Sequence, residues 1–297
     1  MSGTVPQNRM SQSRVSQSRA AEALGAALPP LLVAADRVAS TVAQGVHGRR
    51  RVGQGDSFWQ FRPYVQGDPL GRVDWRQSAR GDRAFVRETE WEAAQTVLLW
   101  RDGSASMRWR SAPELEEKRA RAELLLLALA ALLLRGGERV RLLAEGAATI
   151  SGRHGLDRVA EQMALPADES LFSRIDLPRH ARVVLIGDFL APLGQTAAML
   201  QRFATASVRG HLLQVLDPAE TDLPFAGRVR FRGLEREGET LVPRVQSIRA
   251  AYGEALAAHQ EGLAALCRAA GFSRTLHRTD HPPQMALLGL YAALGRV

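Results

Sequence analysis

Three oxygen-bearing side chains follow an apolar run and have the spacing to bind one divalent cation. The run covers residues 96–100, and Asp102, Ser104 and Ser106 come directly after it at alternate positions. Mg²⁺ prefers oxygen ligands in near-octahedral geometry and keeps several waters, so one carboxylate and two hydroxyls would form a partial shell with a position left open. The alternative is that these side chains cap a following helix, because Asp and Ser satisfy free backbone donors there.

A second carboxylate occupies a comparable place later in the chain. Residues 183–186 are all apolar, which predicts a short buried strand, and Asp188 follows them. The carboxyl ends of parallel strands share one edge, where α/β folds bind ligands. The sequence therefore predicts a metal site formed by Asp102, Ser104, Ser106 and Asp188, with Mg²⁺ or Mn²⁺ as the ion.

The elements that must position these residues alternate between strand and helix. The predicted order after residue 96 is a strand, a helix at 114–134, a strand near Val140, a helix at 156–163, a strand at 183–186, a helix at 195–207 and a strand at 211–216. A hairpin at 227–242, a helix at 248–271, a strand at 273–277 and a helix at 283–294 complete the prediction. Such alternation is typical of an α/β fold with a doubly wound, mostly parallel sheet flanked by helices.

Composition divides the chain into three predicted parts. Residues 1–30 are rich in Ser, Gln, Arg and Ala, which predicts a disordered or frayed tail. Residues 31–95 begin with apolar positions at helical spacing and continue with glycine-punctuated strand-like pieces, so an N-terminal helix and an irregular β segment are expected. Residues 96–297 form the predicted α/β domain.

The formal net charge of +8 raises the question of nucleic-acid binding. The densest basic cluster, at residues 47–51, has no interleaved aromatic side chains for base stacking, and the other charges lie among acidic neighbours. We therefore expect no nucleic-acid partner.

Cysteine content and hydropathy indicate a cytoplasmic protein. The only cysteine, Cys267, has no partner for an internal disulfide, which favours a reducing compartment. The longest apolar stretch, residues 124–134, is shorter than the roughly 20 residues needed to cross a membrane. It is better explained as the buried crossover helix of a βαβ unit. The amino terminus lacks the apolar segment of a signal peptide.

The metal-ligand pattern resembles the von Willebrand factor A-like family, whose metal-ion-dependent adhesion site uses a D-x-S-x-S loop, a threonine loop and a later strand-end aspartate. Asp102, Ser104 and Ser106 match the first element, and Asp188 matches the last. Thr149 lies near the expected place of the threonine in chain order, but no motif around it supports the match. It is therefore not assigned to the site.

Further motifs resemble the DUF58 family, in which a signature block precedes a von Willebrand A-like core. Val73 stands where the family pattern has isoleucine, and the likeness extends from Leu32 to the end of the chain. The matching motifs are Arg62-Pro63-Tyr64, Gly67-Asp68, Val73-Asp74-Trp75 with Ala79-Arg80, Asp217-Pro218-Ala219-Glu220 and Leu223-Pro224-Phe225. Within the signature block we expect charged side chains to pin the segment beside the sheet, with Trp59 and Trp75 packed beneath.

Catalysis receives little support from the sequence. The histidines are scattered, and the only lysine, Lys118, is expected at an exposed helix start. We therefore predict a protein that is not an enzyme but binds a partner protein through the metal site. The DUF58 resemblance implies a MoxR-type AAA+ ATPase as that partner. The alternative is a magnesium-dependent phosphohydrolase on a Rossmann-like sheet with Asp102 as nucleophile, although such enzymes usually place a second carboxylate where this chain has Ser104.

Overall fold

A computed structural model gives the fold of the larger part of the chain. It describes residues 33–40, 42–43, 58–66, 73–81, 83–89, 95–144, 146–164, 177–178, 181–235 and 238–294. The predicted tail at residues 1–30 lies outside these ranges. The described part of the predicted N-terminal helix, at residues 33–40 and 42–43, is helical.

Five parallel strands form the central sheet, in the order β4-β3-β5-β6-β9. Their bounds are β3 (Thr96–Arg101), β4 (Arg139–Leu142), β5 (Arg182–Gly187), β6 (Arg209–Leu216) and β9 (Phe272–Arg278). Strand β5 lies at the centre and is apolar from Val183 to Ile186, because helices cover both of its faces. The polar loops that follow β3 and β5 therefore emerge side by side at one edge.

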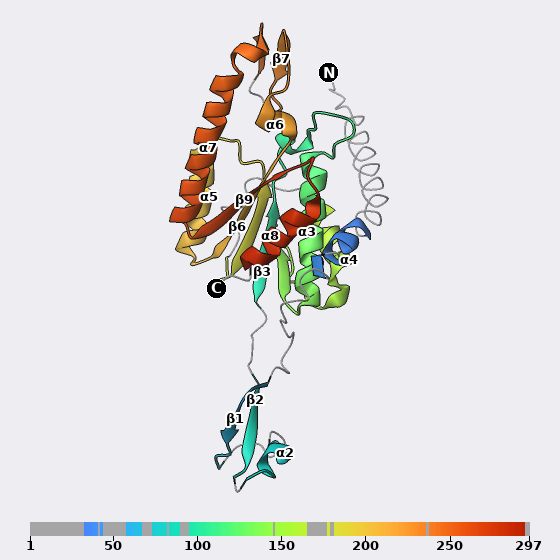
Figure 1. The fold of residues 1–297 in the computed structure, drawn as a ribbon, viewed down its shortest axis with the longest axis vertical. Coiled ribbons are helices and arrows are strands. Elements are labelled where there is room, and N and C mark those ends of the chain that lie inside the picture. Colours follow the sequence, from blue (N-terminus) through green and yellow to red (C-terminus); the bar gives the residue numbers. More distant parts are fainter. Residues whose placement is uncertain are drawn as a thin grey trace, which may run out of the picture.

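Two hydrophobic clusters, one on each face of the sheet, hold the helices in place. Val184 and Ile186 of β5 point into a cluster with α3 (Lys118–Arg135), α4 (Leu156–Ala164) and α8 (Pro283–Leu294). Val183 and Leu185 point into the other cluster, with α5 (Leu193–Thr205) and α7 (Arg249–Ala269). Figure 1 shows these two helical layers on opposite sides of the sheet. The predicted α/β class is confirmed, and the arrangement fits a von Willebrand A-like fold.

Helix α3 is the buried crossover helix that the sequence predicts. From Leu124 to Leu134 it is apolar on every side, and each residue of this stretch is buried. It begins at Lys118 and not at Glu114, because the backbone between these residues forms turns and Lys118 N–H bonds back to the Trp109 carbonyl at 3.3 Å. This later start places the lysine inside the fold.

The remaining predicted elements are present, together with a short helix that the sequence pattern did not indicate. Strands β7 (Val229–Arg232) and β8 (Glu239–Val242) form the expected antiparallel hairpin. Helix α6 (Pro218–Asp222) follows β6 directly. Among the described residues, no helix has both the length and the apolar character to cross a membrane.

The signature segment forms a small antiparallel hairpin of its own, from β1 (Phe58–Pro63) and β2 (Phe85–Thr89), with the short helix α2 (Trp75–Ser78). Asp74 caps α2 by accepting a hydrogen bond from Gln77 N–H at 2.9 Å. The expectation for Trp75 is wrong, since 66% of this residue is exposed. Figure 1 shows the hairpin standing apart from the five-stranded sheet, so that sheet does not cover the tryptophan.

Candidate metal centre

Strands β3 and β5 bring the two predicted loops together. Arg101 pairs with Ile186 in the parallel register, and the next amide, Asp102 N–H, bonds to the Ile186 carbonyl at 2.8 Å. Asp102 thus lies beside Gly187. A Cβ at Gly187 would approach the Asp102 Cβ to 2.9 Å and its Oδ2 to 3.2 Å, so the glycine leaves the space that this carboxylate fills.

Hydrogen bonds connect all four predicted ligands. Ser104 N–H donates to Asp102 Oδ1 at 2.8 Å, and the Ser104 and Ser106 hydroxyls are 3.0 Å apart. Ser106 Oγ then donates to Asp188 Oδ2 at 2.6 Å. The short 3₁₀ turn η2 (Ala105–Arg108) orients Ser106, and fully buried Met107 anchors this turn in the core. The structure therefore places Asp102, Ser104, Ser106 and Asp188 in one cluster.

The capping alternative describes part of this geometry. Asp102 does accept a backbone hydrogen bond, from Ser104 two residues later, which is a local turn interaction. Ser104 precedes the 3₁₀ turn but makes no side-chain capping bond. Its hydroxyl faces Ser106 instead, so the serines belong to the cluster with Asp188 and not to a helix cap.

Within this cluster, Lys118 was expected at an exposed helix start, and the structure shows that expectation to be wrong. Its residue exposure is 0%, and its ammonium bonds to Asp188 Oδ2 at 2.9 Å and to Glu220 Oε1 at 2.5 Å. Burial alone would lower the pKa of this lysine, but the carboxylates of Asp188 and Glu220 raise it above its usual value. The protein thus places a permanent positive charge directly beside the predicted metal ligands.

Helix α6 supplies the second carboxylate that holds Lys118. Asp217 Oδ1 accepts from Ala219 N–H at 2.8 Å, while Glu220 Oε2 accepts from Asp217 N–H at 2.8 Å, which forms a capping box. Asp217 Oδ2 also accepts from Ser111 N–H at 2.9 Å and ties α6 to the loop before α3. The Asp217-Pro218-Ala219-Glu220 motif therefore fixes the helix start and presents Glu220 to the lysine.

Burial and mutual repulsion shape the electrostatics of the cluster. The pKa of Asp102 is raised chiefly by burial and further by the Asp188 carboxylate, although bonds from Ser104 oppose this shift. Burial also raises the pKa of Glu220, and the Lys118 ammonium counteracts it. Glu235 reaches the outer side of the cluster, where its Oε1 accepts from Ser106 N–H at 3.3 Å. A positive charge supplied from solvent would relieve this repulsion.

The donor set fits a hard cation. Carboxylate and hydroxyl oxygens are the ligands that Mg²⁺ and Mn²⁺ prefer. Asp102 Oδ2 and the serine hydroxyls retain acceptor capacity, whereas Asp188 Oδ2 already accepts bonds from Ser106 and Lys118. Within the described ranges no three His, Cys, Asp or Glu side chains gather at ligand spacing. A cation here would therefore depend on the two serines.

Thr149 is not brought to this cluster. It is exposed, and its neighbour Ile150 bridges Val140, which pairs with Val97. Val97 lies five residues before Asp102, and a strand rises about 3.3 Å per residue, so Thr149 lies more than ~10 Å back along the sheet.

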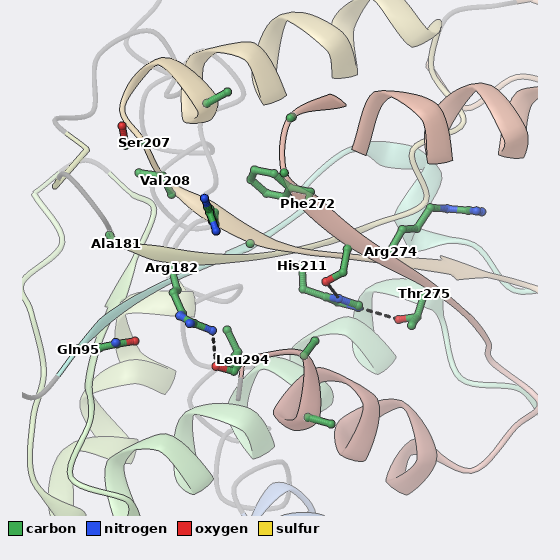
Figure 2. Close-up of a pocket in the computed structure, with 18 of the residues that line it drawn as sticks. Gln95, Ala181, Arg182, Ser207, Val208, His211, Phe272, Arg274, Thr275 and Leu294 are labelled. Atoms are coloured by element: carbon green, nitrogen blue, oxygen red, sulfur yellow. Dashed lines mark hydrogen bonds between the residues drawn. The ribbon is translucent and has the colours of Figure 1, made fainter. Parts of the chain in front are cut away.

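A pocket of about 1110 Å³ lies at the other end of the sheet and contains none of the predicted ligands. Figure 2 shows His211 of β6 in this pocket, with Thr275 of β9 beside its ring. The hydroxyls of Ser273 and Thr275 are each 2.8 Å from a ring nitrogen of His211. Burial lowers the pKa of His211 to about 4, so its ring is neutral at pH 7. The pocket and the predicted metal centre are thus separate features.

The fold and the cluster define a parallel α/β protein. At the carboxyl edge of its sheet it carries carboxylate and hydroxyl oxygens, which are the ligand atoms that hard cations prefer. The model of the family described as "Protein of unknown function DUF58" matches residues 60–262. The chain belongs to the DUF58 family.

Curated relatives of similar length occur in mycobacteria. Uncharacterized protein Rv1480 of Mycobacterium tuberculosis H37Rv and uncharacterized protein Mb1516 of Mycobacterium bovis are each 29% identical over 274 residues, which cover 86% of this chain and 85% of theirs.

Two solved structures from Bacteroides also show similarity. An aerotolerance-related membrane protein from Bacteroides fragilis is 14% identical with a TM-score of 0.36, and BatB from Bacteroides thetaiotaomicron is 13% identical with the same TM-score. Each alignment covers 69% of this chain and 100% of the other. We draw nothing about function from likeness at this level.

Proposed function

We propose that this DUF58 protein is a metal-dependent protein-interaction module. Asp102, Ser104, Ser106 and Asp188 would hold Mg²⁺ or Mn²⁺, and the site would capture an acidic side chain of a partner protein. The observation that carries the proposal is the continuous hydrogen-bonded path from Ser104 through Ser106 to Asp188, which unites two loops that are 82 residues apart between Ser106 and Asp188. The resemblance to the adhesion site of von Willebrand A-like proteins supports it.

Each residue has a distinct part in the proposed site. Asp102 and Asp188 supply negative charge, and the two serines supply neutral oxygens that do not add to the repulsion. The bound ion would provide an open coordination position for a carboxylate oxygen. Asp102, Ser104 and Ser106 are partly exposed, whereas Asp188 is only 4% exposed. The partner would therefore approach over the loop that follows β3, and Asp188 would act from beneath.

We propose a MoxR-type AAA+ ATPase as the partner, on the basis of the DUF58 resemblance. We also propose that the protein acts by binding and not by catalysis. Ser104 stands where a phosphohydrolase of this kind would usually carry its second carboxylate, and a hydroxyl there is a weak proton acceptor.

Asp102→Ala tests the proposal. We expect the variant to lose magnesium-dependent capture of a purified MoxR-type ATPase and to bind MgCl₂ at least tenfold more weakly by calorimetry. Its circular dichroism should stay unchanged, because Asp102 is partly exposed and its partial burial already disfavours its charge. Asp157→Ala, which removes an exposed carboxylate from α4, is the matched control and should behave as wild type.

Two results would count against the proposal. Capture of the ATPase at wild-type strength by Asp102→Ala would reject the adhesion mechanism. Hydrolysis of a generic phosphate ester by the wild type, lost in Asp102→Ala but kept in Asp157→Ala, would favour the phosphohydrolase alternative.

A further inference from the structure

Lys118 is a fully buried cation that shares a ligand with the proposed metal site. Its ammonium and the Ser106 hydroxyl both donate to Asp188 Oδ2, at 2.9 Å and 2.6 Å. Its other carboxylate partner, Glu220, is anchored by the capping box of α6. With an exposure of 0%, Lys118 cannot contact a partner protein itself. Any effect of Lys118 on binding must therefore act through its charge and through the carboxylates that it holds, Asp188 and Glu220.

The charge balance shows what that effect is. The three carboxylates of the cluster that are not exposed, Asp102, Asp188 and Glu220, carry a charge of −3, and Lys118 reduces the net charge to −2. A divalent ion would bring the net charge to zero, so an acidic side chain could reach the open position of the ion without net repulsion. Without the lysine the same loaded site would have a net charge of −1 and would repel it.

We propose that Lys118 is a built-in counter-ion that weakens metal binding at this site and keeps the metal-loaded site from carrying a net negative charge that would repel a carboxylate. The second half of the inference, which concerns the carboxylate of the partner, rests on the proposed function. The first half concerns the affinity for the metal alone. The two halves predict changes in opposite directions when the lysine charge is removed.

Lys118→Met removes the charge while keeping an unbranched side chain of similar length. Calorimetry with MgCl₂ and MnCl₂ should show at least a roughly tenfold gain in affinity, since a unit charge within a few ångströms is removed from a buried site. Capture of the MoxR-type ATPase at saturating Mg²⁺ should fall at least fivefold. Arg119→Met is the matched control, because Arg119 is the next residue on α3 but pairs with Glu123 at 2.9 Å, outside the cluster. It should change neither quantity.

Glu220→Gln tests the same charge balance by removing one negative charge. It replaces Lys118→Met as the test if that variant does not fold. The glutamine oxygen can still accept from Asp217 N–H, so the cap of α6 is kept while one negative charge is lost. Metal affinity should fall several-fold, opposite to the effect of Lys118→Met.

Specific outcomes would overturn the inference. A folded Lys118→Met variant with unchanged or weaker metal affinity would show that the lysine is only structural, as would an unchanged affinity in Glu220→Gln. Tighter metal binding with undiminished capture would reject the electrostatic role toward the partner. Failure of the proposed function is distinguishable, because Asp102→Ala would then retain capture whatever the metal titrations of the Lys118 and Glu220 variants show.

Discussion

At the carboxyl ends of β3 and β5 the protein buries charges, whereas near the amino end of β6 it buries a neutral histidine. Lys118 at the first place has an exposure of 0%, and His211 at the second has 2%. The lysine keeps its charge because Asp188 and Glu220 surround it. The histidine bonds instead to the neutral hydroxyls of Ser273 and Thr275, and burial lowers its pKa to about 4.

This contrast shows which end of the sheet is suited to binding an ion. A neutral imidazole between two hydroxyls has its hydrogen bonds satisfied, and the described residues that line its pocket include no Asp or Glu. The cluster of Asp102, Asp188 and Glu220 has more negative than positive charge even after Lys118 is counted. The hydrogen-bonded histidine links strands β6 and β9. The carboxylate cluster instead keeps an excess negative charge that a bound cation can neutralise.

The largest effect on stability is expected when Lys118, at the carboxyl ends of β3 and β5, is replaced by an uncharged residue. In the absence of divalent metal, Lys118→Met should lower the free energy of unfolding by about 3–5 kcal/mol, because it leaves two carboxylates in a buried site without their cation. Urea denaturation followed by circular dichroism would measure this. If the loss were below ~1 kcal/mol, the buried ion pairs would contribute little, and the contrast with His211 would disappear.

Arg119→Met provides the comparison for this measurement. Arg119 forms a partly exposed pair with Glu123, four residues along the same helix. Such pairs contribute about 0.3–0.5 kcal/mol. The tenfold difference expected between neighbouring positions depends on burial and on the charges around Lys118.

The second expected effect is a loss of stability at acidic pH, and its main source is His211. The pKa of His211 is lowered from 6.5 to about 4, so the unfolded chain binds a proton between these values while the folded protein does not. Stability from this residue is therefore complete above pH 6.5 and falls as the pH approaches 4, by up to about 3 kcal/mol. His277 adds to the same trend, since burial and then Arg121 lower its pKa to about 4 as well.

Replacing His211 separates the two contributions. His211→Leu should flatten the curve of unfolding free energy against pH between 6.5 and 4, and should leave the smaller slope due to His277. Urea titrations at half-unit pH steps would show it. A variant whose stability still falls as steeply as that of the wild type would mean that the buried imidazole is not the acid-sensitive group.

Much of the fold follows from sequence patterns. The apolar run at residues 183–186 and the apolar stretch at 124–134 predict β5 and α3, because a parallel sheet covered on both faces requires strands and crossover helices without a polar side. The four ligands were predicted to meet for the same reason, since their loops follow neighbouring parallel strands. The structure brings these residues together, while metal binding itself stays a prediction.

Lys118 could not be placed from local patterns. A lysine at the start of a helix is usually solvated, and its partners Asp188 and Glu220 are 70 and 102 residues away in the chain. Two signals were nevertheless present: it is the only lysine of the chain, and Asp217-Pro218-Ala219-Glu220 has the spacing of a capping box. Trp75 was misplaced for a similar reason, because its exposure depends on how the hairpin lies and not on the residue type.

The smallest expected effects compare one glycine at each end of the sheet. A Cβ at Gly210 would lie 2.2 Å from the Val183 carbonyl oxygen, which belongs to the backbone of the neighbouring strand and cannot move aside. Gly210→Ala should therefore cost about 2–3 kcal/mol of stability and leave Mg²⁺ affinity unchanged. A Cβ at Gly187 would instead meet the side chain of Asp102, at 2.9 Å from its Cβ.

Gly187→Ala should accordingly cost less stability, about 1 kcal/mol, because a side chain can shift where a carbonyl cannot. The shift would move the Asp102 carboxylate away from the serines, so Mg²⁺ affinity should fall several-fold in this variant alone. Urea denaturation and calorimetry on both variants would test the pair. Equal metal affinities in Gly187→Ala and Gly210→Ala would mean that the position of Asp102 beside β5 does not matter for the site, because only one substitution pushes against that carboxylate.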